Sequence, residues 1–395
     1  MTMGSLRKCE MKYSYNDVMV KPAILSTIEH RAECNPFDEN GMLPLFTAPM
    51  DSVVSINNFD LFAKNGIIPI LPRTDNIVDR LFYACHNKWA AFSLQEFEEE
   101  FTNGKYITAD NIKALIDIAN GHVARLYELV RKAKSIYGDK IQVMVGNIAN
   151  PETYRVCVES QVDYVRCSIG TGQGCITCSN TAIGYPIASL ISEIAEIKND
   201  YIWRGVDKKK LTKIVADGGI RNYSDIIKAL ALGADYVMIG SVFARMLESA
   251  ALKIMERGDK KKLRLRFPLE RYKDVYFKNG SWYGKYTDEF IEEMRGLGRT
   301  VTEDTYDEKP LGEISAKFYG MASKAGQIAM KGKKVHTSEG IEKSLPVTYT
   351  MGTWVENFTD YIRSAMSYTN SRTLDELREA EVVVASQNTY NSVNK

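Results

Sequence analysis

Residues 214–220 of the chain read Ile-Val-Ala-Asp-Gly-Gly-Ile, an apolar run that ends in an acid followed by two glycines. A second run, Val-Met-Ile-Gly-Ser, occupies residues 237–241, and residues 223–232 between the two show the periodicity of a helix. Continuous apolar runs are typical of strands buried on both faces of a parallel sheet, and a helix between two such strands makes a βαβ unit. This part of the chain therefore predicts an α/β fold with a parallel sheet.

The same rhythm of apolar runs and helical patterns extends over most of the chain. Further helical patterns lie at residues 123–133 and 187–197. The segments that read as buried strands are 43–49, 66–71, 114–119, 141–148, 162–169, 211–216, 234–239 and 314–319. Eight such strands fit a closed (β/α)8 barrel, although an open, doubly wound sheet of eight strands would give the same pattern.

Small and polar residues at the strand ends separate these two folds. Such clusters follow nearly every predicted strand, among them Met50-Asp51, Pro72-Arg73, Gly146-Asn147 and Gly240-Ser241. A barrel brings the carboxyl ends of all its strands to one rim, where catalytic residues lie, whereas an open sheet concentrates its ligand-binding residues at one switch point. The spread of the clusters favours a (β/α)8 TIM barrel, with 1–395 as a single barrel domain.

Two segments interrupt this alternation of strand and helix patterns. Residues 258–312 are rich in Lys, Arg, Tyr and Gly, and we expect an insertion of short strands or loops outside the barrel. Residues 322–346 are rich in Gly and Lys without an apolar period, and a polar loop of this length is typical of a mobile catalytic flap or of disorder.

Composition excludes several classes of protein. The 395 residues include 51 basic and 50 acidic side chains, so the net charge of +1 predicts no general attraction to nucleic acid or to a membrane surface. There is no run of about 20 apolar residues and the N-terminus has no hydrophobic signal region, so we expect neither a membrane span nor secretion. Seven irregularly spaced cysteines are typical of a reducing, cytoplasmic setting.

A glycine-rich loop after the predicted strand 162–169 carries the clearest candidate for catalysis. Residues 167–177 read Cys-Ser-Ile-Gly-Thr-Gly-Gln-Gly-Cys-Ile-Thr, and closely spaced glycines let a backbone approach a ligand or ion. Cys175 ends this turn at the catalytic rim, which favours a nucleophilic thiol, and Thr177 could reach the same space. The alternative is that Cys175 is a small buried hydrophobe, the usual place of a free cysteine.

The acid and glycines that follow two later strands predict a phosphorylated ligand. Strand–glycine–helix elements late in such barrels commonly bind phosphate through backbone N–H groups. Asp217, just before Gly218 and Gly219, suits a pair of ribose hydroxyls, and Gly240 with Ser241 repeats the glycine turn in the next unit. A tight turn with a capping acid would explain one such motif. Two neighbouring motifs at one rim favour a phosphate site.

Two further acids have weaker support. Asp117 and Asn120 lie at the end of the predicted strand 114–119 and could bind the ribose or carboxamide of a second ligand, although a simple helix-start turn explains them equally well. Glu339 lies in the flap-like segment, where a solvated carboxylate is the ordinary interpretation.

Taken together, the rim motifs resemble those of the IMP dehydrogenase / GMP reductase family. The matching segments are Ser-Tyr-Asn-Asp-Val at 14–18, Ala-Pro-Met-Asp at 48–51, the cysteine loop at 172–177, Ala-Asp-Gly-Gly-Ile at 216–220, Met-Ile-Gly-Ser at 238–241 and Tyr-Gly-Met at 319–321. The resemblance implies a TIM barrel in which a cysteine thiolate attacks C2 of a purine and holds a covalent intermediate. Hydrolysis of that intermediate is the dehydrogenase activity, and its reduction by NADPH is the reductase activity.

Departures within the family favour the reductase. Residues 73–113 are too few to hold the paired regulatory CBS domains that the dehydrogenase usually carries after its second strand. The loop 323–334 lacks the Arg-Tyr pair of the dehydrogenase flap and resembles the Lys-rich loop of reductases, as does the segment 117–122. Residues 228–233 read more like a dehydrogenase. We expect a GMP reductase that converts GMP to IMP with release of ammonia, and the alternative is an IMP dehydrogenase without CBS domains.

The resemblance also implies roles for individual residues. Cys175 would be the nucleophile, and Thr177 with Glu339 would relay a proton to the departing amine. The implied substrate-binding residues are Ser52, Asp217, Gly218, Gly219, Gly240, Ser241, Tyr319, Gly320 and Met321. The implied NADPH-binding residues are Asp117, Asn120, Gly121 and Gly170, and backbone carbonyls of Gly170, Gly172 and Cys175 could bind K⁺. A cytoplasmic homotetramer is expected on the same ground.

Three positions depart from the pattern of both activities. Gln173 stands where a phosphate-binding serine is common, Pro186 is not followed by the usual glutamine, and Arg245 replaces a small residue. A deoxy or modified guanine nucleotide therefore stays open as the substrate. Two other interpretations stay open as well: a nucleotide-binding relative without activity, and a flavin-dependent barrel that uses the same phosphate loops.

Overall fold

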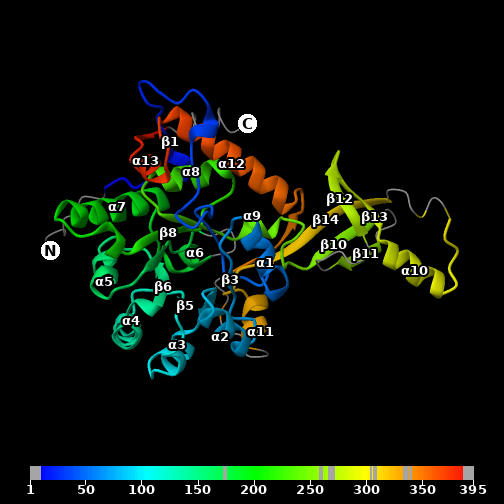
Figure 1. Cartoon of the computed structure of the whole chain (residues 1–395), viewed down its shortest axis with the longest axis horizontal. Coiled ribbons are helices and arrows are strands. Elements are labelled where there is room, and N and C mark those ends of the chain that lie inside the picture. The colour runs from blue at the N-terminus through cyan, green and yellow to red at the C-terminus, as the bar shows by residue number, and fades with distance from the viewer. Residues whose placement is uncertain are drawn as a thin grey trace, which may run out of the picture.

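A closed barrel of parallel strands forms the body of the molecule, and an antiparallel sheet projects from one side of it (Figure 1). The computed structural model describes residues 10–171, 176–257, 261–265, 272–302, 305, 309–331, 337 and 340–385. The predicted site residues Gly172, Cys175 and Glu339 lie outside these ranges.

The barrel sheet has eight strands, the number predicted, in the order β2-β9-β8-β7-β6-β5-β4-β3. The strands are β2 (Leu45–Thr47), β3 (Ile70–Leu71), β4 (Trp89–Phe92), β5 (Ile112–Asp117), β6 (Ile141–Ile148), β7 (Tyr164–Cys167), β8 (Lys213–Asp217) and β9 (Tyr236–Ile239). All of these neighbours are parallel. A parallel bridge between Phe46 of β2 and Ile68, just before β3, joins the two edges of the sheet and closes the barrel. The prediction of a (β/α)8 barrel is confirmed.

Alternate residues of each strand pack inside and outside the barrel. On β7, Val165 and Cys167 belong to the core between strands and helices, whereas Tyr164 belongs to the core inside the barrel. The interior is filled by an aromatic cluster in which the ring of Phe46 lies 6.0 Å from that of Trp89 and 5.1 Å from that of Tyr236. The alternation places Arg166 on the inward face of β7, near its carboxyl end.

Helices cover the outside of the barrel because each has one apolar face. On α8, for example, Ile226, Ala229 and Leu230 are buried, and the side chain of Asn222 caps the helix by accepting a hydrogen bond from the N–H of Asp225. The helices of the barrel are α1 (Ile56–Lys64), α2 (Ile77–Cys85), α3 (Leu94–Phe101), α4 (Ala124–Tyr137), α5 (Thr153–Glu159), α6 (Thr177–Thr181), α7 (Ile187–Trp203), α8 (Tyr223–Ala231), α9 (Ser241–Ala244), α12 (Met351–Tyr368) and α13 (Leu374–Arg378).

One predicted barrel strand was wrong and another was missed. Residues 314–319 belong to β14 (Lys309–Tyr319), which lies in the antiparallel sheet, and the remaining barrel strand is β4. Within 314–319, Ile314, Ala316 and Phe318 are buried and Lys317 between them is exposed, which is the alternation of a half-buried antiparallel strand. β4 reads Trp-Ala-Ala-Phe and is too short to stand out as an apolar run.

The antiparallel sheet extends away from the barrel, and we call residues 253–319 the arm. Its strands are β10 (Lys253–Arg257), β11 (Lys261–Leu265), β12 (Tyr272–Lys278), β13 (Ser281–Tyr286), β14 and, beyond the arm, β15 (Glu342–Pro346). They pair in the order β11-β10-β14-β13-β12, with β15 on β14. Helix α10 (Asp288–Gly296) follows β13. The arm has a small core of its own, around the fully buried Trp282.

We expect Trp282→Phe to weaken the attachment of the arm. The indole Nε1 donates a hydrogen bond of 2.8 Å to the carbonyl of Val347, which follows β15. Phenylalanine keeps most of the apolar volume but leaves that carbonyl without its donor, so the free energy of unfolding should fall by about 1–2 kcal/mol. Denaturant unfolding measures this change. An unfolding free energy equal to that of wild type would show that the hydrogen bond contributes nothing net.

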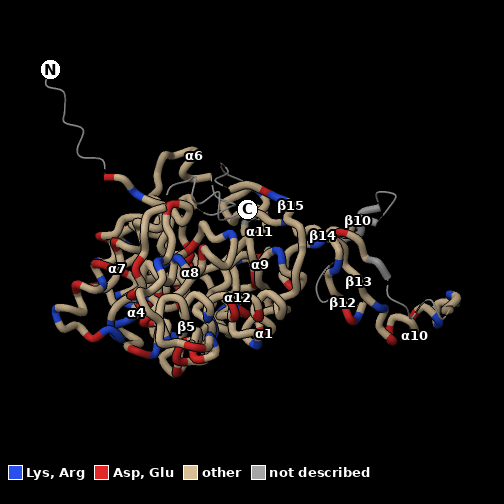
Figure 2. Tube along the Cα trace, turned by 90° about the horizontal axis from the view of Figure 1, so that it is seen from above, with Lys and Arg blue, Asp and Glu red and all other residues tan. Residues whose placement is uncertain are grey.

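The segment 322–346 begins and ends in regular structure. Helix α11 (Lys324–Lys331) packs closely on the turn before it, because a side chain at Gly326 would lie 2.5 Å from the carbonyl oxygen of Met321. β15 pairs with β14 in a register that sets Glu342 opposite Tyr319. In Figure 2, α6, α11 and β15 lie on the same side of the barrel.

Two short strands near the ends of the described chain lie side by side. β1 (Val18–Val20) and β16 (Val382–Val384) form an antiparallel pair. Short 3-10 helices lie at Tyr15–Asp17, Arg31–Glu33, Gly138–Lys140 and Lys208–Lys210. Basic and acidic residues are interspersed over the barrel and the arm (Figure 2). Within the described ranges, no helix has the length and apolar character needed to cross a bilayer.

Candidate active site

A cavity of about 240 Å³ opens at the carboxyl ends of the barrel strands. Residues at or just after the ends of β2, β5, β6, β7, β8, β9 and β14 line it. The predicted site residues that the cavity brings together are Asp117, Gly170, Thr177, Asp217, Gly218, Gly219, Gly240, Ser241, Gly320 and Met321. Residues that are distant in the sequence therefore meet at one rim, as in other barrels of this kind.

Four predicted residues are not among those that line the cavity. The side chain of Asn120 accepts a hydrogen bond from the N–H of His122, and Gly121 packs on β6, where an added Cβ would lie 2.6 Å from the carbonyl oxygen of Asn147. Ser52 is buried beside the rim, and Tyr319 bonds to a neighbouring acid. Their roles in ligand binding stay predictions.

The backbone at the end of β8 turns in a way that suits glycine. Gly218 has φ of +99° and Gly219 has φ of +74°, conformations that side chains disfavour. At the end of β9, a Cβ added to Gly240 would lie 3.3 Å from the sulfur of Met50. Both turns line the cavity, and glycine there leaves no side chain between the backbone and a bound ligand, which suits a phosphate.

The described residues on both sides of Cys175 line the cavity. Gly170 has φ of +81°, and a Cβ there would lie 1.9 Å from the sulfur of Cys178, so only glycine fits. Thr177 begins helix α6 and also lines the cavity. The chain on either side of residues 172–175 thus lies at the rim, and Cys175 itself stays a prediction.

Arg166 forms the electrostatic centre of the cavity, and the sequence reasoning missed it. Its Nη1 donates to Oδ1 of Asp117 at 2.6 Å, and its Nη2 and Nε donate to Oδ2 of Asp217 at 2.8 and 3.0 Å. Asn147 Nδ2 donates to the same Oδ2 at 2.7 Å. A charged residue between the apolar residues Val165 and Cys167 was the signal that could have revealed it, because an unpaired buried charge is not tolerated.

Each of the two acids keeps one oxygen for a ligand. Among the residues that the structure describes, none donates a hydrogen bond to Oδ2 of Asp117 or to Oδ1 of Asp217. Carboxylate oxygens of this kind accept hydrogen bonds from the hydroxyls of a sugar. The cavity can therefore hold two hydroxyl-bearing groups, one at the end of β5 and one at the end of β8.

Tyr319 is held at the rim by a hydrogen bond to Asp51. Its hydroxyl donates to Oδ2 of Asp51 at 2.5 Å, while Oδ1 of Asp51 and Oγ of Ser52 are buried without a partner. Burial raises the pKa of Asp51, and the hydrogen bond from Tyr319 offsets part of that rise. The end of β14 is thereby fixed to the end of β2, although these strands belong to different sheets.

Asp75, in the loop after β3, makes the stability of the rim sensitive to pH. Its Oδ2 is buried without a partner, and burial raises its pKa to about 6, with Arg80 offsetting part of the rise. Between pH 3.8 and about 6 the folded state therefore binds more protons than the unfolded state. Under that condition the stability falls as the pH rises.

We expect Asp75→Asn to remove this loss of stability. The amide carries no charge, so the variant should gain about 1–3 kcal/mol over wild type once the pH exceeds about 6. Melting temperatures measured from acidic to neutral pH give the slope, and Asp79→Asn, on α2, is the matched control that should keep it. A variant whose melting temperature falls as steeply as that of wild type would contradict the assignment to Asp75.

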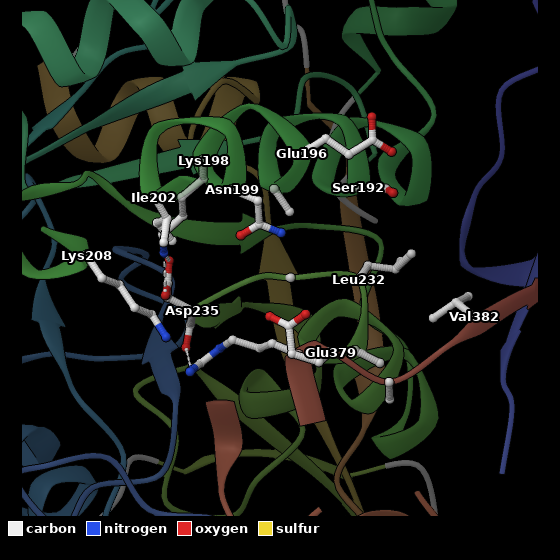
Figure 3. A pocket seen from close by; sticks show the side chains of 15 residues that line it. Ser192, Glu196, Lys198, Asn199, Ile202, Lys208, Leu232, Asp235, Glu379 and Val382 are labelled. Atoms are coloured by element: carbon white, nitrogen blue, oxygen red, sulfur yellow. Dashed lines mark hydrogen bonds and ion pairs between the residues drawn. The ribbon is translucent and has the colours of Figure 1, made fainter. Parts of the chain in front are cut away.

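A second cavity, of about 280 Å³, lies between α7, α8 and the segment after α13 (Figure 3). Lys198 donates to both carboxylate oxygens of Asp235 at 2.6 and 2.7 Å, and Arg378 binds the carbonyls of Ala234 and Asp235. Lys208 pairs with Asp375. Asp235 precedes β9, so this cavity is at the opposite end of the barrel, where paired charges serve stability.

Comparisons with known proteins agree with the geometry of the rim. A model of the IMP dehydrogenase / GMP reductase domain matches residues 90–274. A GMP reductase of Clostridium acetobutylicum is 30% identical over 263 residues, which cover 63% of this chain and 76% of that protein. The chain belongs to the IMP dehydrogenase / GMP reductase family. The resemblance inferred from the rim motifs is confirmed.

Two further relatives are named for the two different activities of the family. A GMP reductase of Aliivibrio fischeri strain ES114 is 25% identical over 403 residues, which cover 97% of each chain. An inosine-5'-monophosphate dehydrogenase of Chlorobaculum tepidum is 30% identical over 264 residues, which cover 67% of this chain and 43% of that protein. Members named for either activity of the family are thus similar to this chain, and the match to the Aliivibrio protein includes the arm.

Proposed function

We propose that the chain is a GMP reductase, which converts GMP and NADPH to IMP, NADP⁺ and ammonia. The observation that supports this best is the pair of acids at the rim, Asp117 and Asp217, each with an oxygen available for a sugar hydroxyl. Two such groups in one cavity suit a nucleotide and a dinucleotide that must react with each other. The similarity to the Aliivibrio GMP reductase over 97% of both chains favours the reductase within the family.

In the proposed reaction the purine is held covalently by Cys175. The Cys175 thiolate adds to C2 of the guanine ring, and the bond from C2 to the exocyclic amine then breaks. Thr177 and Glu339 relay a proton to the amine, which leaves as ammonia because amide ion is a far poorer leaving group. When bound, the dihydronicotinamide supplies a hydride to C2, and the thiolate departs as IMP forms.

The remaining rim residues would orient the nucleotide. Asp217 would accept hydrogen bonds from the ribose, and the N–H groups at Gly218, Gly219, Gly240 and Ser241 would bind the phosphate. Gly320 and Met321, which follow β14, line the same cavity. Ser52 and Tyr319 would contribute through the network around Asp51.

We assign the residues around β5 to the cofactor. Asp117 would bind the nicotinamide ribose, and Ala119, which also lines the cavity, leaves room for a flat ring. Asn120 and Gly121 belong to the same turn, and Gly170 would face the ring from β7. A K⁺ ion held by the carbonyls of Gly170, Gly172 and Cys175 is part of the proposal, as is a cytoplasmic homotetramer.

Turnover with two pairs of substrates tests the proposal. The purified protein is incubated with GMP and NADPH and, separately, with IMP and NAD⁺. Loss of NADPH absorbance with release of ammonia in the first mixture supports the reductase. Formation of NADH in the second mixture alone would overturn it in favour of the dehydrogenase, which the similarity to the Chlorobaculum enzyme keeps as the second candidate. Repeating the first mixture with NADH, dGMP or other guanine nucleotides defines the specificity.

A further inference from the structure

We infer that Arg166 is a positioning residue that links the two ligand subsites of the cavity. By holding Asp117 and Asp217 at once, it orients both acids for their ligands, so that occupation of one subsite strengthens binding at the other. This inference rests on the proposed function for the identity of the two ligands. Nothing in it requires Arg166 to touch either of them.

The geometry around Arg166 makes it the shared support of the two acids. Its side chain is 9% exposed, and it donates through three different nitrogens to two carboxylates on strands that are not neighbours. Asp117 lies at the end of β5 and Asp217 at the end of β8, with β6 and β7 between them. A single guanidinium therefore connects two separate parts of the rim.

Arginine is the side chain that can make these contacts. Its planar guanidinium presents several N–H donors in a fixed arrangement, whereas the ammonium of lysine is a compact point charge on a flexible stem. Without a cation, two carboxylates facing one partly buried cavity would repel each other and lose their hydrogen bonds. Arg166 uses one oxygen of each acid and leaves the other oxygen of each for a ligand.

Coupling between the subsites follows from this shared support. A ligand that binds Asp217 fixes the carboxylate, and the hydrogen bonds to Nη2 and Nε then fix the guanidinium. The same guanidinium holds Asp117, so the second ligand meets a partner that is already ordered. Because the first ligand has already restricted the motion of the guanidinium, the second ligand causes a smaller loss of conformational entropy and binds more tightly.

Binding measurements on variants of Arg166 test the inference. Dissociation constants are measured by calorimetry for GMP and for NADP⁺, a pair that does not react, each alone and in the presence of the other. We expect Arg166→Gln to raise both constants about a hundredfold and Arg166→Lys to raise them about tenfold. In wild type each ligand should lower the constant of the other, and in Arg166→Gln that mutual effect should disappear.

Two controls separate positioning from a general loss of structure. Lys198→Gln also breaks a buried ion pair, at the opposite end of the barrel, and should lower the melting temperature without changing either dissociation constant. In a double-mutant cycle, Arg166→Gln added to Asp217→Asn should change GMP binding less than twofold, because Arg166 acts on the nucleotide through that acid.

The outcomes distinguish this inference from the proposed function. If wild type turns over GMP and the folded Arg166→Gln variant binds both ligands as tightly as wild type, the inference is wrong and the function stands. The inference is also wrong if the two constants rise in Arg166→Gln while the mutual effect of the ligands persists. If wild type binds neither GMP nor NADP⁺, the proposed function is wrong and the inference is lost with it.

Discussion

Substitution Cys175→Ser is expected to lower kcat of GMP reduction by about ten-thousandfold or more, because a serine hydroxyl is a far weaker nucleophile than a thiolate at neutral pH. GMP binding should change little, since the oxygen occupies nearly the same space as the sulfur. Steady-state kinetics and a GMP dissociation constant measured on the same preparation check both statements. Retained turnover in the serine variant would contradict the covalent mechanism.

Four other cysteines of the described chain make poor nucleophiles. Burial raises the pKa of Cys34, Cys85, Cys157 and Cys167, so each of these thiols gives up its proton less readily than an exposed one. Cys85, half-buried on α2, is the matched control, and Cys85→Ser should keep kcat within about twofold, in line with surface substitutions of small effect. A thiol reagent should inactivate wild type, and GMP should protect it.

The paired variants Asp217→Asn and Asp117→Asn are expected to raise KM for different substrates. Asp217→Asn should raise KM for GMP about a hundredfold and change KM for NADPH less, because a charge-assisted hydrogen bond to the ribose is lost. Asp117→Asn should show the reverse pattern. Initial rates with each substrate varied in turn give both constants for both variants.

Each of the two variants serves as a control for the other. Both remove one negative charge from the contacts of Arg166, so a general effect of that charge would appear equally in both. If both variants raise KM for the same substrate, the assignment of β5 to the cofactor and β8 to the nucleotide is wrong.

Much of the barrel could be predicted because its strands are buried on both faces. β6, at 141–148, was predicted with its observed limits, since its first five residues are apolar except for Gln142 and are followed by Gly146 and Asn147. β4 was missed because four residues with two alanines carry too little hydrophobic signal. The strand at 314–319 was misplaced because its apolar residues, taken alone, do not show which sheet they join. Only pairing with β10 and β15 decides that.

The candidate site was predictable where the chain turns and was not predictable inside the strands. Gly218, Gly219 and Gly240 follow strand ends directly, so the barrel alone brings them to the rim. Arg166 was counted as part of an apolar strand, and its partners lie on β5 and β8, a relation that depends on the closure of the barrel. The bond from Tyr319 to Asp51 joins two sheets and has no local signal.

The arm and the mouth of the barrel share one uninterrupted strand. β14 runs for 11 residues from the paired hairpins of the arm to Tyr319, whose hydroxyl is tied to Asp51, and Gly320 and Met321 follow at once. Any change in the tilt of the arm therefore shifts the backbone that borders the proposed nucleotide site. The hairpins of the arm are in this sense mechanically coupled to the mouth of the barrel. Insertions in the arm can accumulate only where they leave the inner end of β14 undisturbed.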